Sequence, residues 1–350
     1  MPVFIGLDLV MRHQLLISIA IATSIGSINC LQMPGVAESR FRPAESQFAN
    51  RLLLSKQPNL VDFPEVGLAI PQPSGFTKAT SFYGFEQADT TSSVMLSKIP
   101  GPFAAVTKGF NKSTLATRGM ELISKRSITI DNQPGLLLNV SQSAYGQKFL
   151  KWILVFGNEQ DTKVITATFL IDNAPKLSEN LKRVVLAVVP SKIAAPAVSS
   201  LPFTVAAVEG LVRVTKITAF GKAAAFTKDG NVPSSSVITD PLLIVTPSLG
   251  AVPVGDRKSF AQQRLSNYPQ IEIEKVTTTN EISIDNLPGW EITANARDLK
   301  TKAPLKIYQV MLFPKSGGYT LMVGMVGDKQ AELYLPKFKA VALTYRHSSN

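Results

Sequence analysis

The stretch Ile128-Thr-Ile-Asp-Asn-Gln-Pro-Gly135 returns later in the chain as Ile282-Ser-Ile-Asp-Asn-Leu-Pro-Gly289. Each copy is followed by two apolar runs, which are Lys151–Phe156 and Val164–Phe169 after the first and Ile307–Phe313 and Tyr319–Met325 after the second. These runs are rich in the β-branched and large residues that are typical of strands. The repeated order predicts that the chain contains one structural unit twice.

Helices are predicted at equivalent places in both copies. Apolar residues recur at i, i+3, i+4 and i+7 near the end of each copy, at Leu181, Val184, Val185 and Val188 and at Phe338, Val341, Ala342 and Tyr345. Earlier segments that can form a helix are Val106–Met120 and Asp256–Leu265. The Asp-Asn turns are too short for a parallel crossover, so the sheets should be mostly antiparallel and the fold class α+β.

The length of 350 residues fits two domains preceded by a leader. The segment between them combines Pro, Ala and Ser without a strong period, as linkers do. The predicted division is a signal peptide at 1–37, an N-terminal arm at 38–61, a first domain at 62–190, a linker at 191–200 and a second domain at 201–347.

The leader has the features of an export signal. Met11-Arg12-His13 precedes the apolar run Leu15–Ala22, and no charged residue occurs between Gln14 and Ala37. Small residues in Gly35-Val36-Ala37 favour cleavage after Ala37, while an uncleaved membrane anchor is the alternative. The single cysteine, Cys30, lies inside this segment, so the mature protein should have neither a thiol nor a disulfide.

The residue inventory disfavours several chemistries. The two histidines are His13, in the leader, and His347, near the C-terminus, so neither domain interior can supply the imidazole of a Ser-His-Asp triad or a His/Cys zinc site. Carboxylate chemistry, serine with lysine as base, and a hard-cation site of oxygen ligands remain open. Asp131 and Asp285 are the obvious carboxylates, but Asp-Asn followed by Gly is a turn sequence. No catalytic, cofactor-binding or metal-binding residue is therefore predicted, and no cofactor.

The net charge of +11 is spread along the chain. Residues 62–190 contain 13 basic and 10 acidic side chains, residues 201–350 contain 17 and 12, and no run of five basic residues occurs. Nucleic acid is disfavoured as a partner because no recognisable binding module is present. Anionic lipid head groups, wall polymer or acidic faces of a membrane complex suit this charge better, although a surface without an electrostatic role is an equal alternative.

Candidate partner-binding residues are mostly basic side chains in predicted helices, strands and loops. Trp152 is included as an aromatic that could stack on a partner, the alternative being a half-buried core residue. The candidates are Lys108, Lys112, Arg118, Lys151, Trp152, Lys300, Lys302 and Lys306.

Several short motifs of the first copy resemble the pattern of the PsbP-like superfamily of exported bacterial, cyanobacterial and chloroplast-lumen proteins. They are Val66-Gly-Leu-Ala-Ile-Pro71, Gly75-Phe76, Gly84-Phe85, Gly119-Met120, Pro134-Gly-Leu-Leu-Leu138, Lys151-Trp152 and Thr166-Ala-Thr-Phe169. The second copy is diverged and matches through Asp285-Asn-Leu-Pro-Gly289 and its closing helix. The resemblance implies two tandem α/β/α sandwich domains, each with a central, mostly antiparallel sheet flanked by helices, and a non-enzymatic accessory role.

The leading functional hypothesis is an exported, non-catalytic binding or assembly factor in the periplasm or thylakoid lumen. It would dock on a membrane-associated or envelope complex, with a protein complex or an anionic membrane surface as partner and no transition metal. One alternative is an exported hydrolase or transferase that uses carboxylate or Ser/Lys chemistry. Another is a carrier of a small apolar ligand between sheet and helix.

Overall fold

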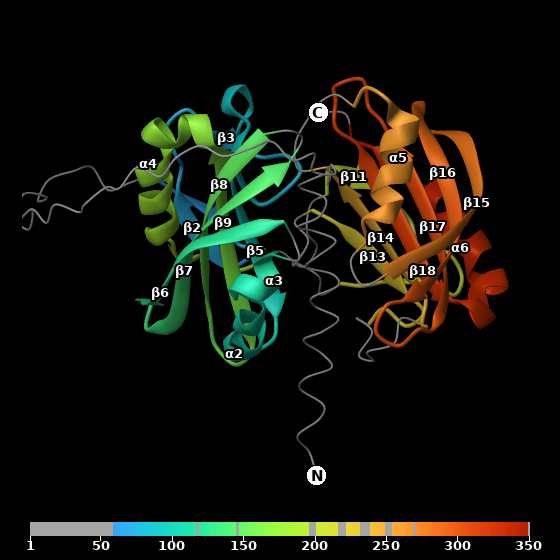
Figure 1. The fold of residues 1–350 in the computed structure, drawn as a ribbon, viewed down its shortest axis with the longest axis horizontal. Coiled ribbons are helices and arrows are strands. Elements are labelled where there is room, and N and C mark those ends of the chain that lie inside the picture. The colour runs from blue at the N-terminus through green and yellow to red at the C-terminus, as the bar shows by residue number, and fades with distance from the viewer. Residues whose placement is uncertain are drawn as a thin grey trace, which may run out of the picture.

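A computed structural model describes residues 59–116, 119–144, 147–195, 201–215, 222–231, 239–248, 254–268 and 271–348. It contains two seven-stranded antiparallel sheets, one from each copy of the repeat (Figure 1). The first has the strand order β3-β4-β5-β9-β8-β7-β6, and the second has the order β12-β13-β14-β18-β17-β16-β15. The predicted α+β class with antiparallel sheets is confirmed, and the two sheets share one connectivity.

The first sheet is formed by β3 (Thr77–Lys78), β4 (Gly84–Gln87), β5 (Ser92–Pro100), β6 (Met120–Ile130), β7 (Gln133–Ala144), β8 (Gln147–Gly157) and β9 (Asp161–Leu170). The second is formed by β12 (Val212–Arg213), β13 (Ala224–Thr227), β14 (Leu242–Pro247), β15 (Ile271–Ile284), β16 (Leu287–Asp298), β17 (Pro304–Leu312) and β18 (Thr320–Gly327). Short 3₁₀ helices follow three of the strands, namely η1 (Ala88–Thr90), η3 (Ile171–Asn173) and η4 (Asp328–Gln330).

The repeated Asp-Asn sequence forms the same hairpin corner in both sheets. Asp131 and Asn132 have φ values of 47° and 58°, and Asp285 and Asn286 have 52° and 59°. Both residues of a two-residue turn adopt positive φ in a type I′ hairpin, a conformation that Asp and Asn tolerate better than most residues. The interpretation of the two aspartates as turn residues is confirmed.

One face of each sheet is covered by the helix that closes the repeat. Helix α4 (Ala174–Leu186) packs on the first sheet and α6 (Ala331–Leu343) on the second. All eight residues of the two predicted apolar stripes are buried, within separate hydrophobic clusters. Local periodicity therefore identified both helices and the faces with which they pack.

The opposite face is covered differently in the two units. In the second unit α5 (Arg257–Ser266) is a continuous helix, and the carboxylate of Asp256 caps it by accepting from the Ser259 backbone N–H. The single helix predicted over Val106–Met120 in the first unit is wrong. That region forms α2 (Phe103–Val106), the 3₁₀ helix η2 (Thr107–Gly109) and α3 (Lys112–Ala116), and Met120 already belongs to β6.

Two residues account for this break. Gly109 is a poor residue for a helix interior. Two positions later the side chain of Asn111 accepts a hydrogen bond from the Thr114 backbone N–H, which begins a new helical turn in place of continuing the old one.

Each unit is also closed by a small sheet that joins its beginning to its end. In the first unit β1 (Leu60–Phe63) and β10 (Val189–Pro190) both pair with β2 (Leu68–Pro71). In the second unit β11 (Phe203–Thr204) pairs with β19 (Arg346–His347).

No helix in the part of the chain that the structure describes is long and apolar enough to cross a membrane. The predicted leader at 1–37, Cys30 and most of the predicted arm lie outside the described residues.

Candidate functional site: a polar row on the first sheet

The two units can be compared position by position, because strand pairing counted from the equivalent hairpin corners aligns their sheets. Ser93 pairs with Thr168 in the first sheet, and Leu242 pairs with Met325 at the same place in the second. One pair further along the same face, Met95 and Thr166 correspond to Ile244 and Val323.

These corresponding positions differ in character. Leu242, Ile244, Val323 and Met325 are buried on the α5 side of the second sheet. Their counterparts Ser93, Met95, Thr166 and Thr168 are partly exposed, since the short helices α2 and α3 pack near the other end of the first sheet. We call these four positions of the first sheet the open face.

A row of polar side chains crosses the open face. Strand pairing places Glu86 of β4 opposite Ser93 of β5, Ser93 opposite Thr168 of β9, and Thr168 opposite Lys151 of β8. Directly paired residues project from the same side of a sheet, and neighbouring strands lie about 4.8 Å apart. The polar row is thus a carboxylate, two hydroxyl groups and an amine in that order.

Lys151 is the unusual member of the row. Its side chain is 5% exposed, and within the described residues it makes neither a hydrogen bond nor an ion pair. Burial lowers its pKa to about 8, because an ammonium group loses hydration inside the protein. The residue at this position of the second sheet is Ile307, which is completely buried.

The pKa of Glu86, at the other end of the polar row, is also shifted in the direction that favours the neutral form. Burial raises its pKa, and this effect is opposed by a backbone hydrogen bond from Thr80 and by the charge of Lys222. Burial and the charge of Lys78 lower the pKa of Lys222. Shifted acids and bases on one face are typical of functional sites, although structural ion pairs cause such shifts as well.

The geometry favours binding over nucleophilic catalysis. A serine activated by lysine needs the two groups within about 2.6–3.2 Å. Ser93 and Lys151 are separated by strand β9, hence by about 10 Å between backbones. The polar row can instead offer the carboxylate of Glu86 and the hydroxyl groups of Ser93 and Thr168 to an extended polar partner, with the buried Lys151 at its end.

The eight residues proposed from the sequence do not form one patch. Lys108, Lys112, Lys300 and Lys302 are exposed, the first two around η2 and α3 and the last two between β16 and β17. Lys306 is partly buried, with its ammonium group 3.0 Å from a carboxylate oxygen of Asp328. Arg118 lies outside the described residues.

Trp152 and Lys151 are both buried, so neither presents an exposed side chain to a partner. The indole N–H of Trp152 donates to the Ser178 hydroxyl of α4 at 3.1 Å, and the ammonium group of Lys182 lies 4.9 Å from its ring centroid. The core interpretation of this tryptophan fits the structure. Lys151 lies next to the open face as a buried residue.

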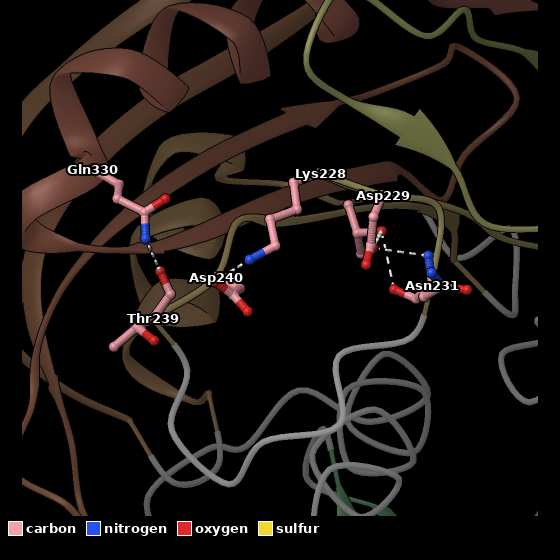
Figure 2. A network of polar contacts seen from close by, with 7 residues as sticks. Lys228, Asp229, Asn231, Thr239, Asp240 and Gln330 are labelled. Carbon is pink, nitrogen blue, oxygen red and sulfur yellow. Dashed lines mark hydrogen bonds and ion pairs between the residues drawn. The ribbon is translucent and has the colours of Figure 1, made fainter.

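A second polar cluster joins the two ends of the β13–β14 connection (Figure 2). Lys228 lies 3.0 Å from the Asp240 carboxylate, and the Asp229 carboxylate accepts from the Asn231 backbone N–H. Gln330 of η4 donates to the Thr239 carbonyl oxygen. Because these groups pair with one another on the surface, the cluster is best explained as a set of contacts that holds the end of β13, the start of β14 and η4 together.

Within the described residues, no group of three or more His, Cys, Asp or Glu side chains is arranged to hold a metal ion. The polar row was missed by sequence reasoning because its members come from four strands. Aligning the repeats would have shown one signal, since Lys151 occupies a position that is apolar in the other copy.

Comparison with known proteins gives similarity in structure only. No protein-family profile matches the chain, and no curated protein matches it. Among solved structures, cyanobacterial PsbP (CyanoP) from Synechocystis sp. PCC 6803 is 17% identical with a TM-score of 0.30, over 38% of this chain and 92% of that one.

Two further solved structures span most of this chain. The Tle4–Tli4 complex gives 12% identity and a TM-score of 0.32, over 80% of this chain and 100% of the matched one. The type VI secretion immunity protein TplEi from Pseudomonas aeruginosa gives 12% identity and a TM-score of 0.29, over 83% of this chain and 98% of that one.

Proposed function

We propose that this protein is an exported, non-catalytic accessory protein of PsbP-like type, with domains at 62–190 and 201–347, that docks on a protein of an envelope or membrane-associated complex. The open face of the first sheet is the docking surface. The observation that carries the proposal is the contrast between the partly exposed Ser93, Met95, Thr166 and Thr168 and their fully buried counterparts in the second sheet.

The chemistry of the open face points to a protein partner with an acidic side chain. Protein interfaces combine apolar contact with a few well-placed polar groups, and the open face offers Met95 beside the hydroxyl groups of Thr166 and Thr168. Lys151 is a cation without a carboxylate in the described residues. A partner carboxylate that reached it would restore the pairing that a buried charge requires.

Substitution on the open face tests the docking proposal. Thr168→Arg places a long charged side chain in the middle of the face and should weaken partner binding about tenfold or more, as disruption of a central contact does. Thr129→Arg, on the exposed edge strand β6, makes the same chemical change away from the face and should leave binding unchanged. The measurement is co-sedimentation of each full-length variant with envelope membranes of the native host.

The same experiment separates a protein partner from a lipid surface. Protease treatment of the membranes should abolish binding, whereas binding to protein-free vesicles of anionic lipid would contradict the proposal. Attachment through exposed lysines such as Lys108 and Lys300 would be released by about 1 M salt, where the screening length falls to about 3 Å. Equal binding of the two threonine variants would rule out the open face.

Export is tested separately by the mass of the natural protein. The uncharged segment ahead of Glu38 predicts that intact-mass analysis of protein from the native host finds a chain that begins near Glu38. A chain that retains Met1 or Met11 in the cytoplasmic fraction would contradict export.

A further inference from the structure

The second unit contains a buried arginine whose guanidinium group has neither a hydrogen bond nor an ion pair among the described residues. Arg264 lies on the inner side of α5 and is 3% exposed, between Ala261 and Leu265, which are also buried. Two of its guanidinium nitrogens, Nε and Nη2, are inaccessible to solvent and make no hydrogen bond. Among the described residues, Arg264 takes part in no ion pair.

The polar groups nearby are already engaged with one another. The guanidinium carbon of Arg264 lies 5.6 Å from the ring centroid of Tyr268. The Tyr268 hydroxyl donates to Oε1 of Gln309 at 2.6 Å, and Nε2 of Gln309 donates to the Ala261 carbonyl at 2.8 Å. The ring face of Tyr268 attracts the cation but accepts neither of its in-plane hydrogen bonds.

The two unpaired nitrogens lie on the same edge of the guanidinium group. Their N–H bonds run parallel, at a spacing that matches the two oxygens of a carboxylate or of a phosphate. In the same chain Arg297 directs its own Nε and Nη2 to the carboxylate of Glu274. Arg264 therefore presents, inside the second unit, the donor pair that Arg297 uses on the surface.

An unpaired guanidinium is an expensive group to bury, because an isolated buried charge is strongly disfavoured unless it is paired. The surroundings of Arg264 belong to the apolar cluster that includes Leu265, Tyr268 and Ile271. Its helix neighbours Gln262 and Gln263 are exposed, so α5 separates the buried Arg264 from solvent on that side.

We propose that Arg264 is the anchor of an anion-binding site under α5, which takes the carboxylate of a small organic acid with an apolar tail. Nε and Nη2 donate to the two carboxylate oxygens, and the tail packs among the apolar side chains of the same cluster. A phosphate group offers the same pair of oxygens, so the test includes it as a second source. This site is independent of docking through the open face.

The test is ligand titration of the full-length protein. Binding is measured by isothermal titration calorimetry and by the change in the midpoint of thermal unfolding, Tm. Sodium octanoate, sodium acetate and inorganic phosphate are compared at constant ionic strength. Octanoate should bind saturably and raise Tm, acetate should bind more weakly, and phosphate should have the smallest effect. Ligands that bind the native state alone stabilise it in this concentration-dependent way.

Three variants connect binding to the proposed donor pair. Arg264→Lys keeps the charge but loses the two parallel donors, and should weaken octanoate binding at least tenfold. Arg264→Met removes the charge and should abolish binding while the protein stays folded, as circular dichroism would show. Arg297→Lys alters the surface pair of the same kind and should leave octanoate binding unchanged.

Two results would overturn the proposal. One is the absence of saturable binding of all three anions to the wild-type protein, a result that does not depend on how any variant folds. The other is octanoate binding of equal strength in the wild-type protein and in Arg264→Lys. Binding of phosphate without octanoate would reject the organic acid and assign the donor pair to a phosphate group.

Discussion

Lys151→Met should raise the free energy of unfolding at pH 7 by about 2–3 kcal/mol. The folded protein holds the pKa of Lys151 at about 8, below the ordinary lysine value of 10.5. At pH 7 the lysine is charged in both states, so the folded state bears the full penalty of a buried ammonium group. Methionine has a similar length and shape without the charge, and the measurement is urea unfolding.

The pH dependence has a definite sign. Because the folded pKa is lowered, the penalty from Lys151 is complete below pH 8 and disappears as the pH rises from about 8 to 10.5. The advantage of Lys151→Met over the wild-type protein should therefore shrink across that window. Lys148→Met changes an exposed lysine of the same strand and should alter stability by less than about 0.5 kcal/mol.

A loss of stability in Lys151→Met would mean that the ammonium group makes a favourable interaction in the folded protein. If the variant is instead more stable and also fails to bind host membranes, Lys151 serves binding at the expense of stability. That combination would support the open face as a functional surface.

Gly289→Ala should destabilise the protein by about 3 kcal/mol or more, whereas Gly135→Ala should change stability by about 1 kcal/mol or less. The two glycines occupy equivalent places in the hairpins of the two sheets. A Cβ atom on Gly289 would overlap the carbonyl oxygen of Met311, which is backbone and cannot move aside cheaply. On Gly135 the nearest atoms would lie 3.3 Å away, so small shifts could accommodate the methyl group.

Thermal unfolding of the two single variants measures this difference. Since the sequence Pro-Gly is identical in the two copies, the intrinsic change from Gly to Ala is the same. Any difference between the stability losses of the two variants then reflects how closely the neighbouring strand approaches the added Cβ atom. Equal losses of stability would show that the two hairpins are packed more alike than their backbones indicate.

The elements that the sequence predicted correctly depend on local patterns. The hairpin corners follow from Asp131-Asn132 and Asp285-Asn286, whose side chains tolerate positive φ. The closing helices follow from apolar spacing that needs no knowledge of the rest of the chain. The continuous helix predicted over residues 106–120 is wrong because Gly109 and the capping side chain of Asn111 divide that segment.

The candidate sites could not be predicted in this way because they depend on strand order. Glu86 of β4 and Lys151 of β8 lie on the same face because β5 and β9 stand between these strands and pair with them in a register that aligns the two residues. Arg264 has the sequence signature of an ordinary helical residue, and its isolation results from Tyr268 and Gln309 bonding to each other. Whether a charged side chain is buried without a partner depends on three-dimensional packing, so composition and periodicity do not predict it.

In each unit a small sheet brings the beginning and the end of the unit together at one side. In the first unit β1 and β10 both adjoin β2, and in the second β11 adjoins β19. Copying a gene segment that encodes such a unit adds a self-contained unit to the chain, because no described strand of either copy pairs with a strand of the other. Tandem duplication therefore needs no change of strand pairing in either sheet. The helices that pack on each sheet can then diverge separately in the two copies.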